Sequence, residues 1–219
     1  MKKILSLIAL MIFSATQFSF AQKTLTEATV VYKMNMTGPG MDDPQAAAML
    51  QNMMVSNYFK NGKFASVMDM GIMKTRTIMK SDGNFVTLMD MMGQKFKIAM
   101  DKAQYTDKKK VKDSEYDVRV TEEKKVIAGY NCTKSIIMTK KGKSFDVWLT
   151  NEITGDASKN IGPYSKVNGM LMQYSMEEKG NTITMTCQSV DFSPVSDEVF
   201  TIPEGYTEMT LDQMAKMGM

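Results

Sequence analysis

The stretch Lys124–Thr150, KKVIAGYNCTKSIIMTKKGKSFDVWLT, decides the fold, because it predicts two antiparallel strands and the turn between them. We place the turn at Lys140–Lys143, where Gly142 allows the positive φ of a tight hairpin and β-branched or apolar runs flank it. Closing the turn there pairs Met138 with Phe145, Ile136 with Val147 and Lys134 with Leu149. One face is then apolar and the other mostly polar, the pattern of a sheet packed on one side.

Further hairpins surround this one in the chain, after a first strand over residues 25–36. Asn61-Gly62 predicts a hairpin between residues 55–60 and 63–70, and Asp82-Gly83 predicts one between 72–80 and 85–91. A turn at Gly93 would place Asp90 opposite Lys95 and Met89 opposite Phe96. A hairpin about Lys179-Gly180 would pair Met176 with Ile183 and Tyr174 with Met185.

Helices are few in this pattern. Asp43-Pro44 predicts a helix start, followed by one apolar stripe made of Ala46, Met49, Leu50, Met53 and Met54. A second short helix is placed within residues 151–168, and Thr210 with Gln213 forms a capping box before a terminal helix. The fold class is β-rich α+β, with a curved antiparallel sheet of about ten or eleven strands and two or three covering helices.

Three segments carry a family resemblance: Ile127–Cys132 (IAGYNC), Trp148–Thr150 (WLT) and Val199–Tyr206 (VFTIPEGY). Together they resemble the bacterial family called domain of unknown function 4412. That family is similar to the LolA/LolB-like lipoprotein-carrier half-barrels, in which a curved antiparallel sheet and a few helices enclose an apolar cavity. The resemblance therefore implies a LolA-like open half-barrel outside the cytoplasm, and it implies no reaction.

The first 21 residues predict a signal peptide. Lys2 and Lys3 form its positive region, residues 4–13 form its apolar region, and Ser19-Phe20-Ala21 offers a cleavage site. No Cys follows the apolar region, so the segment is not a lipoprotein signal. We expect cleavage after Ala21, a single domain over residues 22–219, and a periplasmic, monomeric protein.

Composition argues against several classes of function. The formal net charge is +3 with both signs mixed, which gives no electrostatic footprint for nucleic acid. The chain contains no His, so His-dependent triads and His-ligated zinc sites are excluded. No nucleophile elbow, P-loop or dinucleotide fingerprint occurs in the required context. We therefore expect a protein that is not an enzyme and uses no cofactor.

Methionine is the most unusual feature, with 25 residues, many of them two apart on predicted strands. These residues suit an ordinary core, a pliable apolar cavity, or a site for Cu(I) or Ag(I). We favour the cavity, which would hold a hydrophobic small molecule, a lipid or a lipoprotein acyl chain. The alternatives are a structural module with a filled core that contacts an envelope protein, and a soft-metal protein. The predicted lining is Met68, Met70, Met89, Phe96, Ile98, Met138 and Phe145.

The oxidising periplasm would favour a disulfide between Cys132 and Cys187. A simple meander of four strands opposes this, because it separates them by about 14 Å, whereas a disulfide needs roughly 4.4–6.8 Å between Cα atoms. The bond requires a curled or reordered sheet, and otherwise both are small buried apolar residues. Trp148, the only tryptophan, falls on the polar side of its hairpin, either under a docked helix or stacked on a ligand.

Overall fold

The structure is a computed structural model that describes residues 22–39, 53–80, 82–101, 116–140, 142–155, 164, 166–178 and 180–216. Strands dominate this part of the chain, and twelve of them form one large sheet while β1 and β11 form a small parallel pair. The strands are β1 Lys23–Thr24, β2 Glu27–Thr37, β3 Met53–Lys60, β4 Lys63–Asp69, β5 Met73–Met79, β6 Phe85–Met91, β7 Gln94–Met100, β8 Tyr116–Ile127, β9 Tyr130–Thr139, β10 Ser144–Thr150, β11 Ile153–Thr154, β12 Met170–Glu178, β13 Asn181–Asp191 and β14 Thr207–Glu208.

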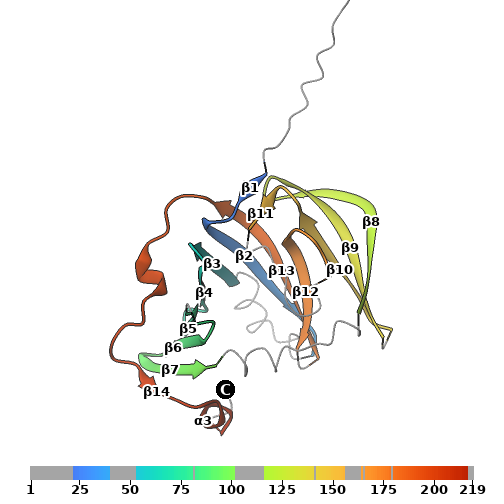
Figure 1. The fold of residues 1–219 in the computed structure, drawn as a ribbon. Helices are drawn as coiled ribbons and strands as arrows, with labels where there is room; N and C mark the ends of the chain where they lie inside the picture. Colours follow the sequence, from blue (N-terminus) through green and yellow to red (C-terminus); the bar gives the residue numbers. More distant parts are fainter. Residues whose placement is uncertain are drawn as a thin grey trace, which may run out of the picture.

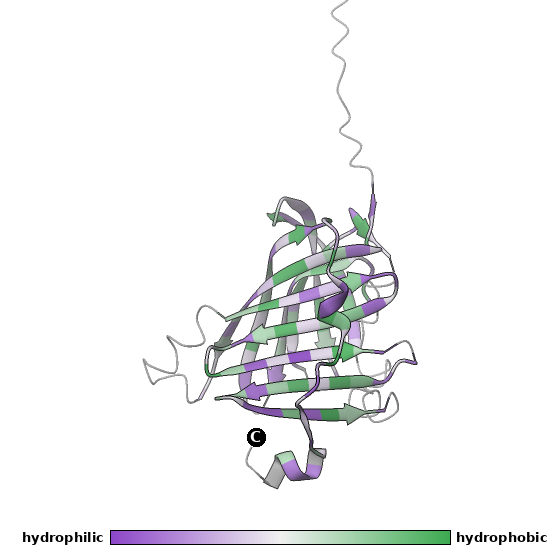
Figure 2. Ribbon diagram, turned by 90° about the vertical axis from the view of Figure 1, so that its left-hand side faces the viewer, coloured by the Kyte–Doolittle hydropathy of each residue, from purple (hydrophilic) through white to green (hydrophobic). Residues whose placement is uncertain are grey.

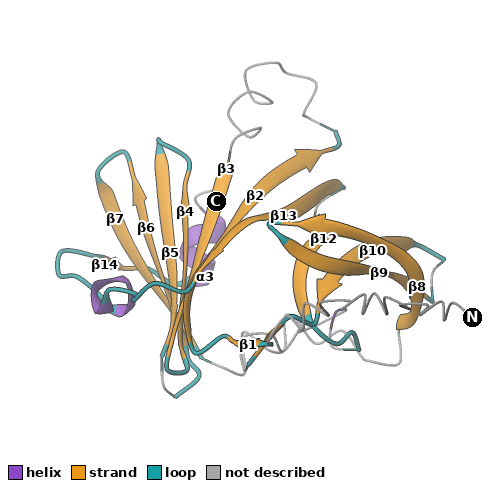
Figure 3. Cartoon of the chain, turned by 90° about the horizontal axis from the view of Figure 1, so that it is seen from above, coloured by secondary structure: helices purple, strands orange, loops and turns teal. Residues whose placement is uncertain are grey.

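The large sheet has the order β14-β7-β6-β5-β4-β3-β2-β13-β12-β10-β9-β8. All of its pairings are antiparallel except the short parallel pair β14/β7. The sheet bends about β2 and β13, so that β3–β7 form one wall and β8, β9, β10 and β12 form the other (Figures 1 and 3). The long pairing of β2 with β13 joins segments from opposite ends of the chain, and it holds the two walls together.

In the first wall, β3–β7, the turns at Asn61-Gly62 and Gly93 have the predicted registers. The register at Asp82-Gly83 differs from a two-residue turn by one residue, because Met79 lies opposite Phe85 and the Lys80 N–H donates to the Asn84 carbonyl. Lys60 lies opposite Lys63, with Asn61 and Gly62 at positive φ, as a type I′ turn requires. In the β6–β7 hairpin, Asp90 lies opposite Lys95 and Met89 opposite Phe96, as predicted. The β12–β13 pairings predicted for Met176 and Tyr174 are also confirmed.

The predicted register of the β9–β10 hairpin is wrong by one residue. Phe145 lies opposite Ile137 rather than Met138, and Val147 lies opposite Ser135. The Lys143 amide N–H donates to the Thr139 hydroxyl, and the Thr139 N–H donates to the Lys143 carbonyl, so Thr139 rather than Lys140 lies opposite Lys143 and the turn is one residue longer than predicted. The inner side chains of β10 keep their predicted face, whereas those of β9 are reversed.

The second wall also differs from the prediction at the start of the Lys124–Thr150 hairpin, where one predicted strand is divided between β8 and β9. The chain turns at Ala128-Gly129, both at positive φ, so Lys124 to Ile127 belong to edge strand β8. The β8–β9 register shifts between Val120 and Lys124, and bulges of this kind are common at sheet edges.

The outer face of the first wall is covered by the C-terminal segment, residues 192–206, which crosses the strands (Figure 2). Phe200, Tyr206 and Tyr58 pack on a cluster made of Ala65, Ile78, Val86 and Leu88. A 3-10 turn, η4 Asp197–Phe200, is held to the hairpin below by ion pairs from Asp197 to Lys60 and Lys63 at 2.9 and 3.1 Å. The segment therefore seals one side of β3–β7.

The main core lies on the other side, around β2, β12 and β13. Its fully buried side chains include Val30, Met172 and Cys187. A second cluster on β9 and β10 is covered by Tyr164 and Val167. Edge-to-face ring contacts run from Phe145 to Tyr164 and from Tyr164 to Tyr174, at centroid distances of 6.2 and 5.4 Å, and they link the two clusters.

Helices are scarcer than the sequence pattern predicts. The described residues include one α-helix, α3 Leu211–Lys216, and the single turn η4. The capping box is confirmed, since the Thr210 and Gln213 side chains accept each other's backbone N–H groups at 2.8 and 3.2 Å. Met53 and Met54, predicted as helical, begin β3 because Met53 pairs with Met34 of β2. The rest of that predicted helix lies outside the described residues. Within the described part, no helix has both the length and the apolar character needed to cross a membrane.

Candidate functional site

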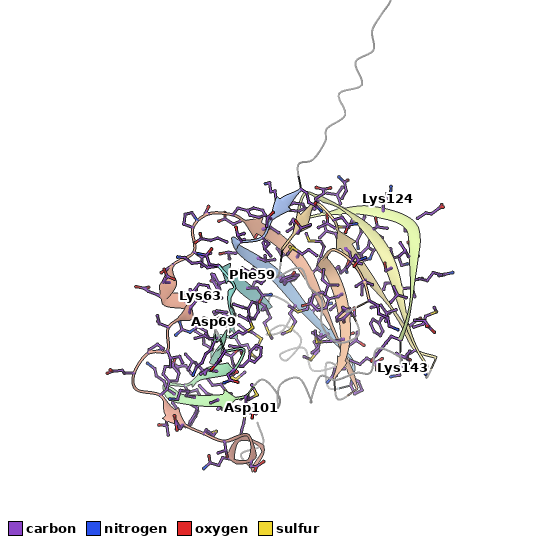
Figure 4. The ribbon with its side chains drawn as sticks, in the orientation of Figure 1. Phe59, Lys63, Asp69, Asp101, Lys124 and Lys143 are labelled. Carbon is purple, nitrogen blue, oxygen red and sulfur yellow. The ribbon has the colours of Figure 1, made fainter. Side chains whose placement is uncertain are left out.

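The face of the first wall opposite the C-terminal segment is the candidate site, and we call it the inner face. Its strand residues follow from the registers, because side chains on one face alternate along each strand and align across strands. Val55 and Phe59 of this face pack against the main core, which places the inner face inside the bend of the sheet. Figure 4 shows Phe59 on this wall.

Three cross-strand rows make up the middle of the inner face. Each crosses β3, β4, β5, β6 and β7 in that order. The methionine row is Val55, Met68, Thr75, Met89 and Phe96. The polar row is Asn57, Ser66, Thr77, Thr87 and Ile98. The aromatic row is Phe59, Phe64, Met79, Phe85 and Met100.

Charge is divided sharply between the two faces of β3–β7. No charged side chain occurs at the inner positions of these five strands, whereas all of their lysines, aspartates and the arginine alternate onto the outer positions. Several of those outer charges form ion pairs, as Lys60 does with Asp197 of the C-terminal segment and Lys97 with Glu208 of β14, both at 2.9 Å. The inner face of the first wall is therefore uncharged and mostly apolar, and most of its polar side chains lie in one row.

Methionine is divided in the same way. These five strands hold eight methionines, of which only Met54 alternates onto the outer face. The seven inner ones are Met53, Met68, Met73, Met79, Met89, Met91 and Met100. Their side chains are buried or half-buried, and none is among the exposed large hydrophobic residues. The methionines of these five strands are thus concentrated on one surface of the sheet.

Four of the seven predicted lining residues lie together on this face: Met68, Met89 and Phe96 in the methionine row, and Ile98 in the polar row. Met70 follows the end of β4, where its N–H donates to the Met73 carbonyl. Met138 is 38% exposed on the opposite side of β9, because of the register shift described above. Phe145 packs in the second cluster against Tyr164. The structure thus separates Met138 and Phe145 from the other four.

Sequence reasoning missed the polar row. Only Ile98 of this row was a predicted lining residue, although Ser66 and Thr87 lie two residues from the predicted positions Met68 and Met89. The predicted hairpin at Asn61-Gly62 aligns Asn57 with Ser66, as observed. However, no predicted turn joined Ser66 to Thr77, and a two-residue turn at Asp82-Gly83 would have placed Thr77 opposite Leu88 rather than Thr87. The sequence therefore indicated only part of the polar row.

The cysteines are buried free thiols, and the disulfide that the compartment would favour is not formed. Cys132 lies on β9 and Cys187 on β13, with β10 and β12 between them, which is the separation that the meander predicts. Burial raises the pKa of the Cys132 thiol to about 11 and that of Cys187 to about 12. Both thiols are therefore protonated and unreactive at neutral pH.

Trp148 has no helix docked on it among the described elements. The Lys125 ammonium lies 4.0 Å from the centre of its ring, in a cation–π contact, and it also donates to the Gln173 side chain. Burial lowers the pKa of Lys125. Trp148 therefore packs in the second wall and takes no part in the inner face of the first.

Two clefts occur outside the inner face. One of about 430 Å³ lies between the β4–β5 and β6–β7 turns, beside Ile72 and Met92. The other, of about 340 Å³, lies under the C-terminal segment between Arg76 and Tyr206. Within the described ranges, no group of three or more Cys, Asp and Glu side chains is arranged to hold a metal ion.

A family model described as Domain of unknown function (DUF4412) matches residues 30–162, more than half of the chain. This match includes two of the three segments that carried the resemblance, IAGYNC and WLT. Among proteins of curated function, none matches the chain.

Solved structures with a similar course of the chain are distant in sequence. PNGF-II has a TM-score of 0.45 and 12% identity, and the match covers 88% of this chain and 33% of PNGF-II. The lipoprotein LppX of Mycobacterium tuberculosis has a TM-score of 0.37 and 13% identity, with 77% and 88% covered. A LolA superfamily protein from Nitrosomonas europaea has a TM-score of 0.27 and 10% identity, with 84% and 94% covered. The chain spans about a third of PNGF-II, and none of these TM-scores establishes a shared function.

Proposed function

Since this chain belongs to the DUF4412 family, whose description specifies no activity, we propose from its geometry that it binds a hydrophobic molecule on the inner face without transforming it. The ligand class is a lipid or a lipid moiety such as an acyl chain. The mature protein acts in the periplasm after cleavage of the N-terminal segment, as a monomer and without a cofactor.

The observation that carries the proposal is the division of side chains between the faces of β3–β7. All the charges are outside, and seven of eight methionines are inside. A wall that only separated core from solvent would not need methionine, because branched aliphatic side chains specify a packed core better. Unbranched thioethers adapt to ligands of variable shape, and apolar concave surfaces are the usual binding sites.

Non-catalytic binding is supported by what the inner face offers chemically. Its strand positions carry amide, hydroxyl and thioether groups, and none of these is an acid, a base or an activated nucleophile. The two buried thiols lie in the main core and are held protonated by burial.

A displacement assay with a fluorescent fatty acid tests the proposal on the chain from residue 22 to 219. We expect saturable binding of the probe and competition by unlabelled fatty acids. A structural envelope module with a filled core, the first alternative, would give no saturable binding.

A second candidate function, binding of Cu(I) or Ag(I), is favoured by one feature of the register. Met34 of β2 lies opposite Met53 of β3 on one side and opposite Met185 of β13 on the other. Directly opposed side chains have Cβ atoms about 4.5–5.5 Å apart, so three thioethers could converge on one soft ion. Met68, by contrast, lies opposite Val55 and Thr75 and has no directly opposed methionine.

Titration with Ag(I) separates this candidate from lipid binding. Stoichiometric uptake that Met34→Leu abolishes and Met68→Leu preserves would support a metal site. Equal, weak uptake by both variants would leave only non-specific thioether contacts.

A further inference from the structure

The polar row lies between two apolar rows in the middle of the inner face. The Thr77 and Thr87 hydroxyls are 3.1 Å apart and hydrogen-bond each other across β5 and β6. The Asn57 side chain occupies the same row on β3, opposite Ser66 on one side and Val30 on the other. The row therefore gathers most of the neutral hydrogen-bonding groups of the inner face, whereas the methionine row has one hydroxyl, that of Thr75, and the aromatic row has none.

Asn57 is the unusual member of the row. Its Oδ1 atom is buried and has no hydrogen-bond partner among the residues that the structure describes. An unpaired buried acceptor is unfavourable, and a leucine of similar size would remove that cost. Ser66 lies directly opposite on β4 but makes no hydrogen bond with this oxygen, and Phe64 and Met68, diagonally across β4, offer no donor. The buried Asn57 Oδ1 atom is therefore suited to accept a hydrogen bond from a donor group on the ligand.

The nature of that donor follows from the surroundings. No charge occurs on the inner strand positions, so the row does not match a carboxylate, phosphate or ammonium group. Apolar rows on both sides place the polar group within an apolar chain rather than at its end. Met68, diagonally across β4 from Asn57, has a flexible side chain that can repack around a ligand.

We propose that the polar row is a hydrogen-bonding subsite centred on Asn57, and that the ligand is an acyl chain bearing a hydroxyl group part-way along its length. The hydroxyl donates to Asn57 Oδ1, and the alkyl segments on either side lie on the methionine and aromatic rows. This inference rests on the proposed function and specifies its ligand class.

The test compares octadecanoic acid with a set of its monohydroxylated derivatives in the displacement assay. We expect at least one hydroxyl position to bind about three- to ten-fold more tightly than the unsubstituted acid, which is the worth of one hydrogen bond. Asn57→Leu should abolish this preference while still binding octadecanoic acid. Ser56→Ala, on the outer face of the same strand, is the matched control and should keep the preference.

The outcomes separate the two proposals. If the unsubstituted acid binds as tightly as every hydroxylated one, the subsite is refuted while lipid binding stands. If no fatty acid binds, the proposed function itself fails. If Asn57→Leu keeps the preference, Asn57 is not the acceptor. Denaturation by urea should find Asn57→Leu at least as stable as the wild type, and Asn57→Ala replaces it in the assay if it does not fold.

Discussion

Leu88→Ala should destabilise the protein strongly without weakening lipid binding. Leu88 is 1% exposed and packs with Ala65, Ile78 and Val86 under the C-terminal segment. Losing its buried methyl groups costs about 2 kcal/mol by transfer alone. Leaving a cavity at this buried position raises the loss to roughly 3–4 kcal/mol of unfolding free energy. For a chain of this size that lowers Tm by roughly 6–16 °C.

Urea denaturation followed by Trp148 fluorescence measures this loss, and the fatty-acid assay is run on the folded variant. Val120→Ala is the control, because Val120 is 69% exposed and its truncation should be nearly neutral. A loss below about 1 kcal/mol would show that the C-terminal segment does not seal the outer face. A several-fold change in lipid affinity would show that the two faces of β6 are not independent.

Two further predictions concern stability. Ala128→Asn should stabilise the fold by about 0.5–1 kcal/mol, because Ala128 has φ 50° and Asn tolerates that conformation better; a lower urea midpoint would contradict this. Burial raises the pKa of both thiols above their ordinary value of 9, to about 11 and about 12. The two thiols therefore bind their protons more tightly in the folded state than in the unfolded state. Their contribution to the free energy of unfolding is fully present below pH 9 and is lost as the pH rises towards 12. The double variant Cys132→Ala, Cys187→Ala should show a shallower loss between pH 9 and 10 than the wild type, and identical slopes would count against buried, protonated thiols.

Local sequence signals correctly predicted the strand register where the turn residues allow only one turn type. Asn61-Gly62 permits a type I′ turn that fixes the register of β3 and β4 at once. Lys140–Lys143 permits turns of different length, and the Thr139 hydroxyl decided between them. The difference of one residue in the β9–β10 register puts Met138 on the opposite face of β9 from the one predicted, so it does not lie with the other lining residues.

The remaining differences come from contacts distant in sequence. The local sequence pattern around Met53 is compatible with the end of an amphipathic helix and with a strand. Met53 is in a strand because it pairs with Met34 of β2. The C-terminal segment could not be placed from its own sequence, because Phe200 and Tyr206 pack on strands more than a hundred residues earlier. The inner face was predictable in part, since alternation alone put Met68, Met89, Phe96 and Ile98 together.

Thr75→Trp tests the central claim most directly. Thr75 lies on the inner face between Met68 and Met89, and an indole there would occupy the space of a ligand. Lys74→Trp is the matched control, because Lys74 is the adjacent residue and is exposed on the outer face. The measurement is the dissociation constant of the fluorescent fatty acid for both folded variants. We predict a loss of at least ten-fold for Thr75→Trp and little change for Lys74→Trp, whereas equal affinities would contradict a ligand site on the inner face.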